Sequence, residues 1–167
     1  MIESERLIYR KYEDSDLVFL ASMLSDVEMV KFIGEGNTRD MQESKGFLAW
    51  IYSHYESNDE FGLRLMVRKS DGALVGHAGL VPQQIEGVEE LEIGYWIARD
   101  YWGKGYASEA ARTFKTRGID VIKASRLISL IQPANKASRK VAEKIGMALE
   151  KEILLKGKDV CVYVYNK

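Results

Sequence analysis

The stretch Tyr101–Ala111, YWGKGYASEAA, decides more about the fold than any other part of this sequence. It follows a predicted strand and opens a predicted helix. Gly103 and Gly105 have no Cβ, so the main chain can bend sharply here and approach a ligand closely. The bend and the helix N-terminus would aim several free N–H groups at one point, which favours an anion such as a pyrophosphate. Lys104 would add a charge and Ser108 a hydroxyl; a simple tight strand-to-helix connection is the alternative.

Two other phosphate-binding patterns do not fit the sequence. A P-loop requires G-x-x-x-x-G-K-S/T, which the chain lacks. A dinucleotide fingerprint requires G-x-G-x-x-G after an early strand, but Ser108 stands where the third glycine would be. The glycine turn also follows a region predicted to be antiparallel. A nucleotide-binding domain of another fold is therefore the weaker interpretation.

The residues before the glycine turn predict helices followed by antiparallel strands. One amphipathic helix would be capped by Asp14 or Ser15, and a second would begin at Thr38 and end near Asn58. Turn signals at Ser70–Gly72 and near Gly87 separate the later strands. The predicted strands are Arg6–Arg10, Gly62–Arg68, Ala73–Val81 and Glu90–Ala98.

The residues after the turn alternate between helix and strand. We predict a helix from Ala107 to Ile122, with Gly118 inside it for close packing although glycine costs a helix about 1 kcal/mol relative to alanine. A strand, a helix closed by Gly146 and two last strands follow, at Arg126–Gln132, Lys136–Ile145, Ile153–Leu155 and Val160–Tyr165. This order predicts a mixed α+β sheet. No repeat or linker divides the sequence, so residues 1–167 are predicted to form one domain.

Composition excludes several classes of function. The chain has 167 residues, of which 46% are hydrophobic and 29% charged, and its net charge is −1. These values are typical of a globular protein and leave no basic excess for a nucleic acid. One cysteine, Cys161, and two histidines, His54 and His77, make a disulfide or a protein-built metal site unexpected. No stretch resembles a signal peptide or a membrane span. We expect a cytoplasmic protein with no metal, membrane or nucleic-acid partner.

Four separated motifs resemble the GNAT acetyltransferases in order and spacing: EIGYWI at Glu92–Ile97, YWGKGYA at Tyr101–Ala107, Glu109-Ala110, and NKAS at Asn135–Ser138. The opening SERLIYR at Ser4–Arg10, followed by Asp16, is similar to that of the branch with ribosomal-protein and spermidine acetyltransferases. The resemblance implies the GNAT fold, a central, mostly antiparallel twisted sheet splayed between its fourth and fifth strands and flanked by helices. It also implies acetyl-CoA as cosubstrate and an amine acceptor, and homodimers are frequent in that family.

The resemblance implies cofactor-binding roles for three segments. The family's pyrophosphate loop, Q/R-x-x-G-x-G/A, corresponds to Trp102, Gly103, Lys104, Gly105, Tyr106 and Ala107, and Ser108 follows it. Trp102 replaces the usual Gln or Arg, and its alternative role is packing against the sheet. The pantetheine arm of acetyl-CoA binds the splayed strand as a pseudo-strand, near Tyr95, Trp96 and Ile97. Asn135 is similar to the asparagine that holds the cofactor arm, and a helix N-cap is its alternative role.

Two residues are the catalytic candidates. Glu92 lies on the strand that presents the thioester in the resembled family, and a carboxylate there can accept a proton from the attacking amine. Its alternation with apolar neighbours fits a pocket-facing carboxylate, whose pKa burial would raise, and also an exposed strand residue. The tyrosine that many GNAT enzymes use as proton donor to the thiolate is replaced by Ala142. Ser138, at a position used in the resembled branch to hydrogen-bond the sulfur, is the candidate donor, with a structural first-turn serine as the alternative.

The sequence therefore predicts an N-acetyltransferase that moves an acetyl group from acetyl-CoA to a primary amine by direct transfer. The missing tyrosine keeps a non-catalytic acyl-CoA-binding sensor as the alternative. The acceptor pocket is expected near Val27–Thr38 and Gly157. Acidic residues there would favour a cationic amine or would simply be solvated; they are Glu35, Glu86, Glu89 and Glu90.

Overall fold

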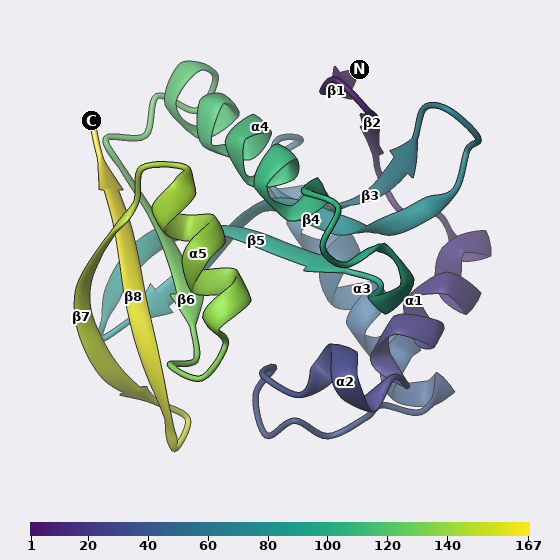
Figure 1. The fold of residues 1–167 in the computed structure, drawn as a ribbon, viewed down its shortest axis with the longest axis horizontal. Helices are drawn as coiled ribbons and strands as arrows, with labels where there is room; N and C mark the ends of the chain where they lie inside the picture. Colours follow the sequence, from purple (N-terminus) through teal and green to yellow (C-terminus); the bar gives the residue numbers. More distant parts are fainter.

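A computed structural model describes all residues from Met1 to Lys167, and it contains one sheet with helices on both faces (Figure 1). The strand order is β1-β2-β3-β4-β5-β6-β8-β7, and every neighbouring pair is antiparallel except β5 and β6. The strands are β1 (Ile2–Glu3), β2 (Leu7–Arg10), β3 (Gly62–Arg68), β4 (Leu74–Ile85), β5 (Val88–Ile97), β6 (Arg126–Ile131), β7 (Ala148–Leu155) and β8 (Lys158–Asn166).

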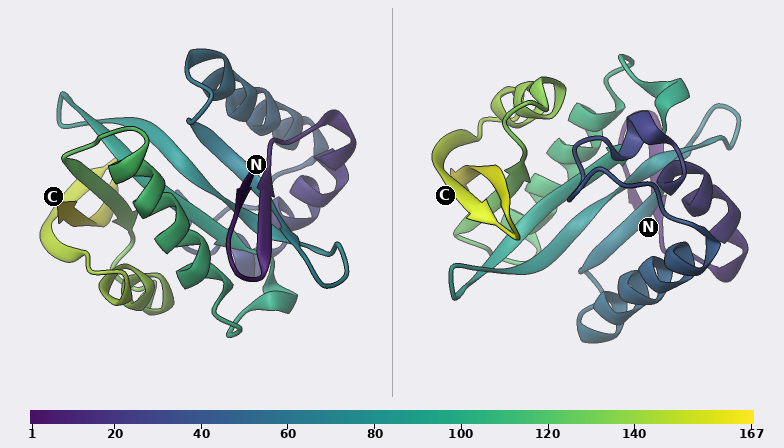
Figure 2. Two further views of the ribbon diagram at one scale, coloured as in Figure 1. Left: turned by 90° about the horizontal axis from the view of Figure 1, so that it is seen from above. Right: turned by 90° about the horizontal axis from the view of Figure 1, so that it is seen from below.

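The helices divide between the two faces of the sheet (Figure 2). One face carries α1 (Leu17–Leu24), α2 (Val27–Val30) and α3 (Met41–Ser57). The other carries α4 (Tyr106–Asp120) and α5 (Lys136–Lys144). None of these helices is both long enough and apolar enough to cross a membrane.

The sheet separates two apolar clusters. The larger lies under α4 and α5 and contains Phe114 and Leu127, whereas the smaller lies under α1 and α3 and contains Leu20 and Ile51. Fully burying a side chain of this size stabilises the fold by about 1.5–3 kcal/mol. The predicted close packing at Gly118 is confirmed, because a Cβ there would lie 2.9 Å from both terminal methyl carbons of Leu127.

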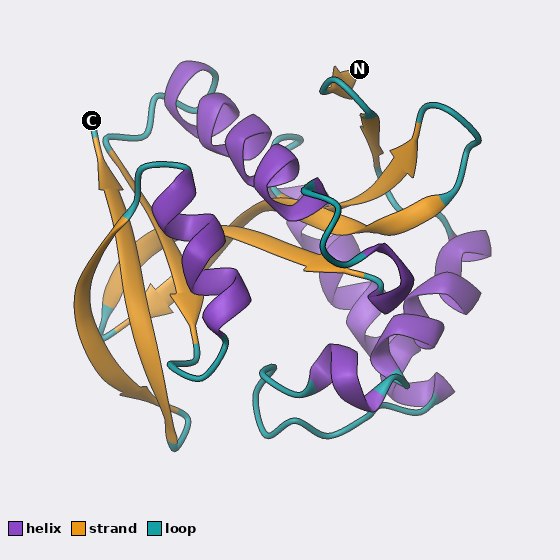
Figure 3. Ribbon diagram, viewed as in Figure 1, coloured by secondary structure: helices purple, strands orange, loops and turns teal.

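The central strand β5 is paired very differently with its two neighbours. It pairs with β4 along its whole length, from Gly76↔Ile97 to Ile85↔Val88, but with β6 only at Glu92↔Ile128. Beyond Glu92 the two strands diverge, which the orange ribbons of Figure 3 show plainly. The predicted mixed sheet, splayed between the fourth and fifth predicted strands, is therefore confirmed.

Helix starts were predicted less well than the helices themselves. The cap of α3 is Asp40 rather than Thr38, and its side chain accepts a hydrogen bond from the Glu43 N–H at 2.8 Å. Before α1, residues 14–16 form a 3-10 turn, so Asp16 rather than Asp14 or Ser15 precedes the helix. The Asp16 carboxylate takes two hydrogen bonds from Arg10, at 2.7 and 2.8 Å. These polar interactions fix the starts in ways that apolar spacing does not encode.

Candidate active site

The splay between β5 and β6 opens into a cleft of about 610 Å³. The cleft is walled by α2 and the loop after it, by β5, the glycine turn and the start of α4, and by β6 and α5. The predicted site residues that line it are Glu92, Tyr95, Trp96, Ile97, Trp102, Gly103, Gly105, Tyr106, Ala107, Ser108, Asn135 and Ser138. Lys104 lies in the glycine turn but not in the lining. Residues more than forty positions apart in the sequence therefore meet in one place.

The glycine turn has the left-handed conformation that glycine permits. Gly103 has φ 73° and Gly105 has φ 82°, and Gly105 immediately precedes α4. The first N–H groups of a helix have no partner within the helix, and Gly105 has no side chain that could cap them. Ser108, in the first turn, is buried and borders the cleft. The turn thus presents main-chain donors and the positive end of a helix dipole to the cleft.

Arg6 holds this turn from the N-terminal segment, a contact that the sequence analysis missed. Its Nη1 donates to the Lys104 carbonyl at 2.9 Å, and its Nε donates to Glu109 Oε2 at 2.7 Å. Glu109 Oε1 also accepts from the Arg6 N–H at 2.7 Å and from Ser4 Oγ at 2.6 Å. Partial burial alone would raise the pKa of Glu109, but these hydrogen bonds outweigh it and the pKa is lowered. The guanidinium also covers the Tyr106 ring at 4.4 Å.

The main chain of β5 turns alternate residues toward the opening. The Ile93 carbonyl accepts from Ser129 Oγ on β6 at 3.0 Å, and the Ile97 carbonyl accepts from Trp102 Nε1 at 2.7 Å. Main-chain groups of a strand alternate sides with a period of two. Tyr95 lies midway between these two residues and past the only β5–β6 bridge, so its N–H and C=O face the cleft. Trp102 is 47% exposed, so its indole serves mainly as a donor rather than as core packing.

Glu92 lies at the vertex of the splay, opposite Ile128. Its side chain is partly buried in the cleft wall, and this desolvation raises its pKa from 4.5 to about 8. Hydrogen bonding to the Gln83 side chain and to the Leu130 main chain opposes the rise without cancelling it. A carboxyl with a pKa in this range can exchange a proton near neutral pH.

Ser138 and Asn135 stand at the start of α5. Asn135 is the N-cap of this helix, as its alternative role proposed, and its Oδ1 accepts from the Ser138 N–H at 3.2 Å. Its side-chain NH₂ group takes no part in the cap. The Ser138 hydroxyl lies 3.2 Å from the Tyr95 hydroxyl across the cleft. Ala142, one turn further along, is completely buried, so that turn of α5 contributes no hydroxyl to the site.

The loop after α2 closes one end of the cleft. Gln132 Nε2 donates to the Gly34 carbonyl at 2.8 Å, and Lys158 Nζ lies 3.4 Å from Glu35. Both contacts join this loop to the β6 side of the splay. The carboxylates that line the cleft are Glu28 and Glu92.

The acidic residues of the β4–β5 hairpin do not line the cleft. Glu86 pairs with Lys151 at 2.8 Å, and Glu90 pairs with Arg126 at 3.0 Å. Glu89 is exposed. Glu86 and Glu89 are solvated, as one of the two interpretations proposed, whereas Glu90 is held in a partly buried ion pair.

Known proteins share both the sequence and the fold. Residues 6–148 match the family model described as "Acetyltransferase (GNAT) domain". The chain belongs to the GNAT acetyltransferases. It is 35% identical over 163 residues to the uncharacterized protein YkkB of Bacillus subtilis strain 168, covering 96% of this chain and 92% of that protein.

Solved structures of this GNAT fold superimpose over almost the whole chain. A GNAT-family acetyltransferase from Bacillus anthracis is 29% identical, with a TM-score of 0.82 and coverage of 99% of this chain and 97% of that one. The ribosomal L7/L12 α-N-protein acetyltransferase RimL, solved in complex with coenzyme A, is 18% identical with a TM-score of 0.81 and the same coverage. At that identity RimL shares the fold alone.

Two other groups of this GNAT acetyltransferase lie outside the cleft lining. His77 is fully buried beside Trp96, and its Nδ1 is 2.8 Å from the Tyr12 hydroxyl while its Nε2 has no partner. Burial lowers the pKa of His77 to about 3. Cys161 is a free, buried cysteine in β8.

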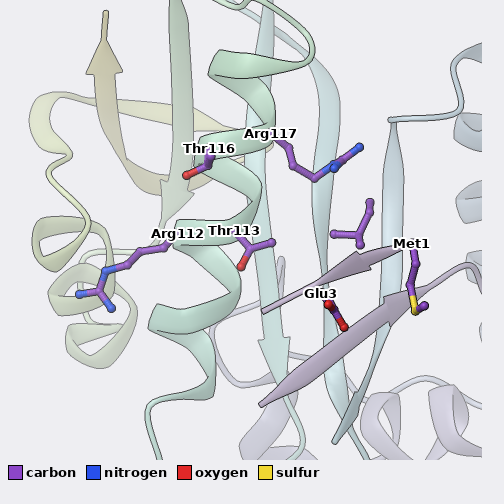
Figure 4. Close-up of a pocket in the computed structure, with 7 residues that line it drawn as sticks. Met1, Glu3, Arg112, Thr113, Thr116 and Arg117 are labelled. Atoms are coloured by element: carbon purple, nitrogen blue, oxygen red, sulfur yellow. The ribbon is translucent and has the colours of Figure 1, made fainter. Parts of the chain in front are cut away.

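A second hollow of about 440 Å³ lies between α4 and β1 (Figure 4). Met1, Glu3, Arg112 and Thr116 are among its lining residues, and it includes no predicted site residue. No group of three or more His, Cys, Asp or Glu side chains lies close enough together to hold a metal ion.

Proposed function

We propose that this GNAT acetyltransferase moves the acetyl group of acetyl-CoA directly to the nitrogen of a primary amine. One observation carries the proposal: a single cleft is lined by the glycine turn at the start of α4, an opened strand with free main-chain groups, and the side chains of Glu92 and Ser138. Glu92 is at the vertex of the splay, and the glycine turn follows the far end of β5. A long, bent substrate with a diphosphate at one end and a thioester at the other matches this layout.

The glycine turn would hold the diphosphate of acetyl-CoA through the main-chain N–H groups at the start of α4. Main-chain groups of Tyr95 would pair with the amides of the pantetheine arm, as an added strand pairs with a sheet edge. The NH₂ group of Asn135 is free to donate to the same arm, because only its Oδ1 caps α5. The presence of coenzyme A in RimL, which has the same fold, supports this assignment.

Glu92 would act as the general base. Most primary amines are protonated at pH 7 and must lose a proton before attacking the thioester carbonyl. The elevated pKa of Glu92, about 8, matches the carboxylate to proton transfer near neutral pH, either directly or through one water molecule. Once ionised, the carboxylate accepts the proton that the nitrogen loses.

Ser138 would stabilise the departing sulfur. When the tetrahedral intermediate collapses, the C–S bond breaks and its electron pair stays on the sulfur. A hydroxyl at the positive end of α5 can donate a hydrogen bond to that thiolate, and the helix dipole supports the same charge. A protonated amine loses two protons overall, one before the attack and one as the amide nitrogen forms. The first removes the ammonium charge, and the second balances the negative charge left on the sulfur.

The acceptor would be a protein N-terminus, a polyamine or another small primary amine. Two carboxyl groups line the cleft, Glu28 on α2 and Glu92 on β5, and in their ionised form they favour a cationic group over an anionic one. Protein N-termini have the lowest pKa of these amines, about 7.7–8.0, so they supply the most neutral nucleophile at pH 7.

The second candidate is an acyl-CoA-binding sensor without turnover, and one observation favours it: Ala142 is buried and supplies no proton donor. The two functions make opposite predictions for thiol release. We would incubate the protein with acetyl-CoA and a panel of polyamines, amino acids and peptides with free N-termini, and measure free CoA with a thiol reagent. Binding of acetyl-CoA by calorimetry without amine-dependent thiol release from any acceptor would refute the enzyme.

Glu92→Gln is the variant that tests the base, and Glu89→Gln on the same strand is the matched control because Glu89 is exposed. General-base catalysis typically contributes about 10²–10⁴-fold, so Glu92→Gln should lose a rate in that range near pH 8. Its loss should shrink at high pH, where free amine is abundant. An unchanged pH–rate profile would eliminate Glu92 as the base.

A further inference from the structure

Two hydroxyl groups meet across the cleft at the point where β5 faces α5. The Tyr95 hydroxyl donates to the Ser138 carbonyl at 3.0 Å, and the Ser138 hydroxyl lies 3.2 Å from the Tyr95 oxygen. Both residues line the cleft that contains Glu92 and the glycine turn. The pair therefore bridges the two sides of the splay beside the proposed reaction centre.

The two hydroxyl protons of this pair have defined acceptors. A tyrosine hydroxyl and a serine hydroxyl carry one donor each. The Tyr95 proton is used on the Ser138 carbonyl, so the Ser138 proton points to the Tyr95 oxygen. No hydrogen bond donates to Ser138 Oγ, and the Ser138 proton is held in a bond that can be exchanged for another acceptor. Burial raises the pKa of Tyr95 to about 12, so its hydroxyl keeps its proton at neutral pH.

We propose that Tyr95 is a positioning residue for Ser138 and forms with it a two-hydroxyl switch that stabilises the CoA thiolate. This inference rests on the proposed function, in which Ser138 faces the sulfur. As negative charge develops on the sulfur, the Ser138 hydroxyl rotates its proton from the Tyr95 oxygen to the sulfur. The Tyr95 hydroxyl then rotates its proton from the Ser138 carbonyl to Ser138 Oγ. Neither hydroxyl makes or breaks a covalent bond in this step.

The switch makes the Ser138 hydroxyl a stronger hydrogen-bond donor to the sulfur than a serine hydroxyl with no such partner would be. A donor that itself accepts a hydrogen bond becomes stronger, since chains of hydrogen bonds polarise one another. The rigid ring of Tyr95, fixed on β5, also restricts where the Ser138 hydroxyl can sit. A phenylalanine at this position would keep the ring packing and remove only the hydroxyl, with its two hydrogen bonds to Ser138. The hydroxyl of Tyr95 can therefore be tested separately from its ring.

The test measures the thiol pKa of bound CoA, which requires no knowledge of the acceptor. The full chain is saturated with CoA carrying ¹³C at the carbon next to the sulfur, and the carbon shift is followed by NMR from about pH 6 to pH 10. Tyr95→Phe should raise the pKa of the bound thiol by about one unit, a tenfold change in thiolate stability. Ser138→Ala should raise it at least as much. In the Ser138→Ala background, Tyr95→Phe should add nothing, because the proposed route passes through Ser138.

Tyr52→Phe is the matched control. Its hydroxyl donates to Asp14 at 2.8 Å outside the cleft, so its loss should leave the thiol pKa unchanged. Melting temperature and CoA affinity are measured for every variant. A wild-type chain that does not bind CoA would refute the proposed function itself. A chain that binds CoA, but whose thiol pKa ignores Tyr95→Phe or shifts equally with and without Ser138, would overturn the switch alone. A folded Tyr95→Phe variant that loses CoA affinity would also contradict it, because the hydroxyl is assigned to stabilising the thiolate through Ser138 and not to binding CoA.

Discussion

The elevated pKa of Glu92 means that this carboxyl destabilises the folded chain whenever it is ionised. Its pKa is about 8 in the fold against an ordinary 4.5, and desolvation by burial is the largest cause. Because the folded-state pKa is the higher one, the folded chain binds one more proton than the unfolded chain between these two values. The stability that the folded chain gains by holding this proton is fully present below about pH 4.5 and is lost as the pH rises through about 8.

Glu92→Gln removes this titration and keeps the size of the side chain. Each pKa unit corresponds to about 1.4 kcal/mol, so the difference between 4.5 and about 8 corresponds to on the order of 5 kcal/mol in the unfolding free energy. We expect the variant and the wild type to be similarly stable at pH 4.5. At pH 9 the variant should be more stable by several kcal/mol. Glu92, which the proposed chemistry needs, would then lower the unfolding free energy of the wild-type chain at high pH.

Urea unfolding at several pH values, followed by circular dichroism, measures this difference directly. Glu89→Gln is the control, since that side chain is exposed on the same strand and its replacement should leave the pH dependence unchanged. If wild type and Glu92→Gln lost stability in parallel from pH 5 to pH 9, Glu92 would have an ordinary pKa in the fold. The argument from burial at the splay would then be wrong.

Three further substitutions test the glycine turn, its support and the packing of α4. Gly105→Val places a side chain at φ 82° beside the Arg6 guanidinium, and it should weaken CoA binding at least about tenfold by calorimetry. The control Gly157→Val has a similar φ of 81° in open space and should leave CoA affinity unchanged. If the two variants bound CoA equally well, the turn would be rejected as the binding site. Arg6→Ala should lower the unfolding free energy by about 1–3 kcal/mol and weaken CoA binding, because it removes charged hydrogen bonds that hold the glycine turn. A folded variant with normal CoA affinity would show that the turn does not need Arg6. Gly118→Ala should lower the unfolding free energy, measured in urea, by about 1 kcal/mol or more. Alanine favours helices, but its Cβ would lie 2.9 Å from the Leu127 side chain. A variant more stable than the wild type would contradict the close packing.

The order of elements could be predicted because it depends on local signals. Alternating strands, glycine turns and helical spacing leave a pattern within ten or fifteen residues. The glycine turn itself was predicted from two residues, Gly103 and Gly105, whose conformation the structure shows to be left-handed. The α2 helix was missed because it has only four residues. The start of β7 was missed because it lies at the sheet edge, where polar residues on both faces leave no apolar alternation.

The contacts that complete the site could not be predicted in the same way. Arg6 reaches a carbonyl 98 positions away, and Tyr95 meets Ser138 across 43 positions. Such pairs depend on where the splay places β5 relative to α4 and α5, which no local pattern encodes. The role of Glu92 depends on burial as well, since an alternating strand has two faces and the sequence does not show which one borders the cleft.

A crystal structure of the chain with CoA would test the central claim most directly. The account predicts the diphosphate against the main-chain N–H groups that follow Gly103, with the pantetheine arm along Tyr95 and the sulfur between Glu92 and Ser138. Coenzyme A bound outside the splay between β5 and β6, or with its sulfur turned away from both side chains, would contradict it.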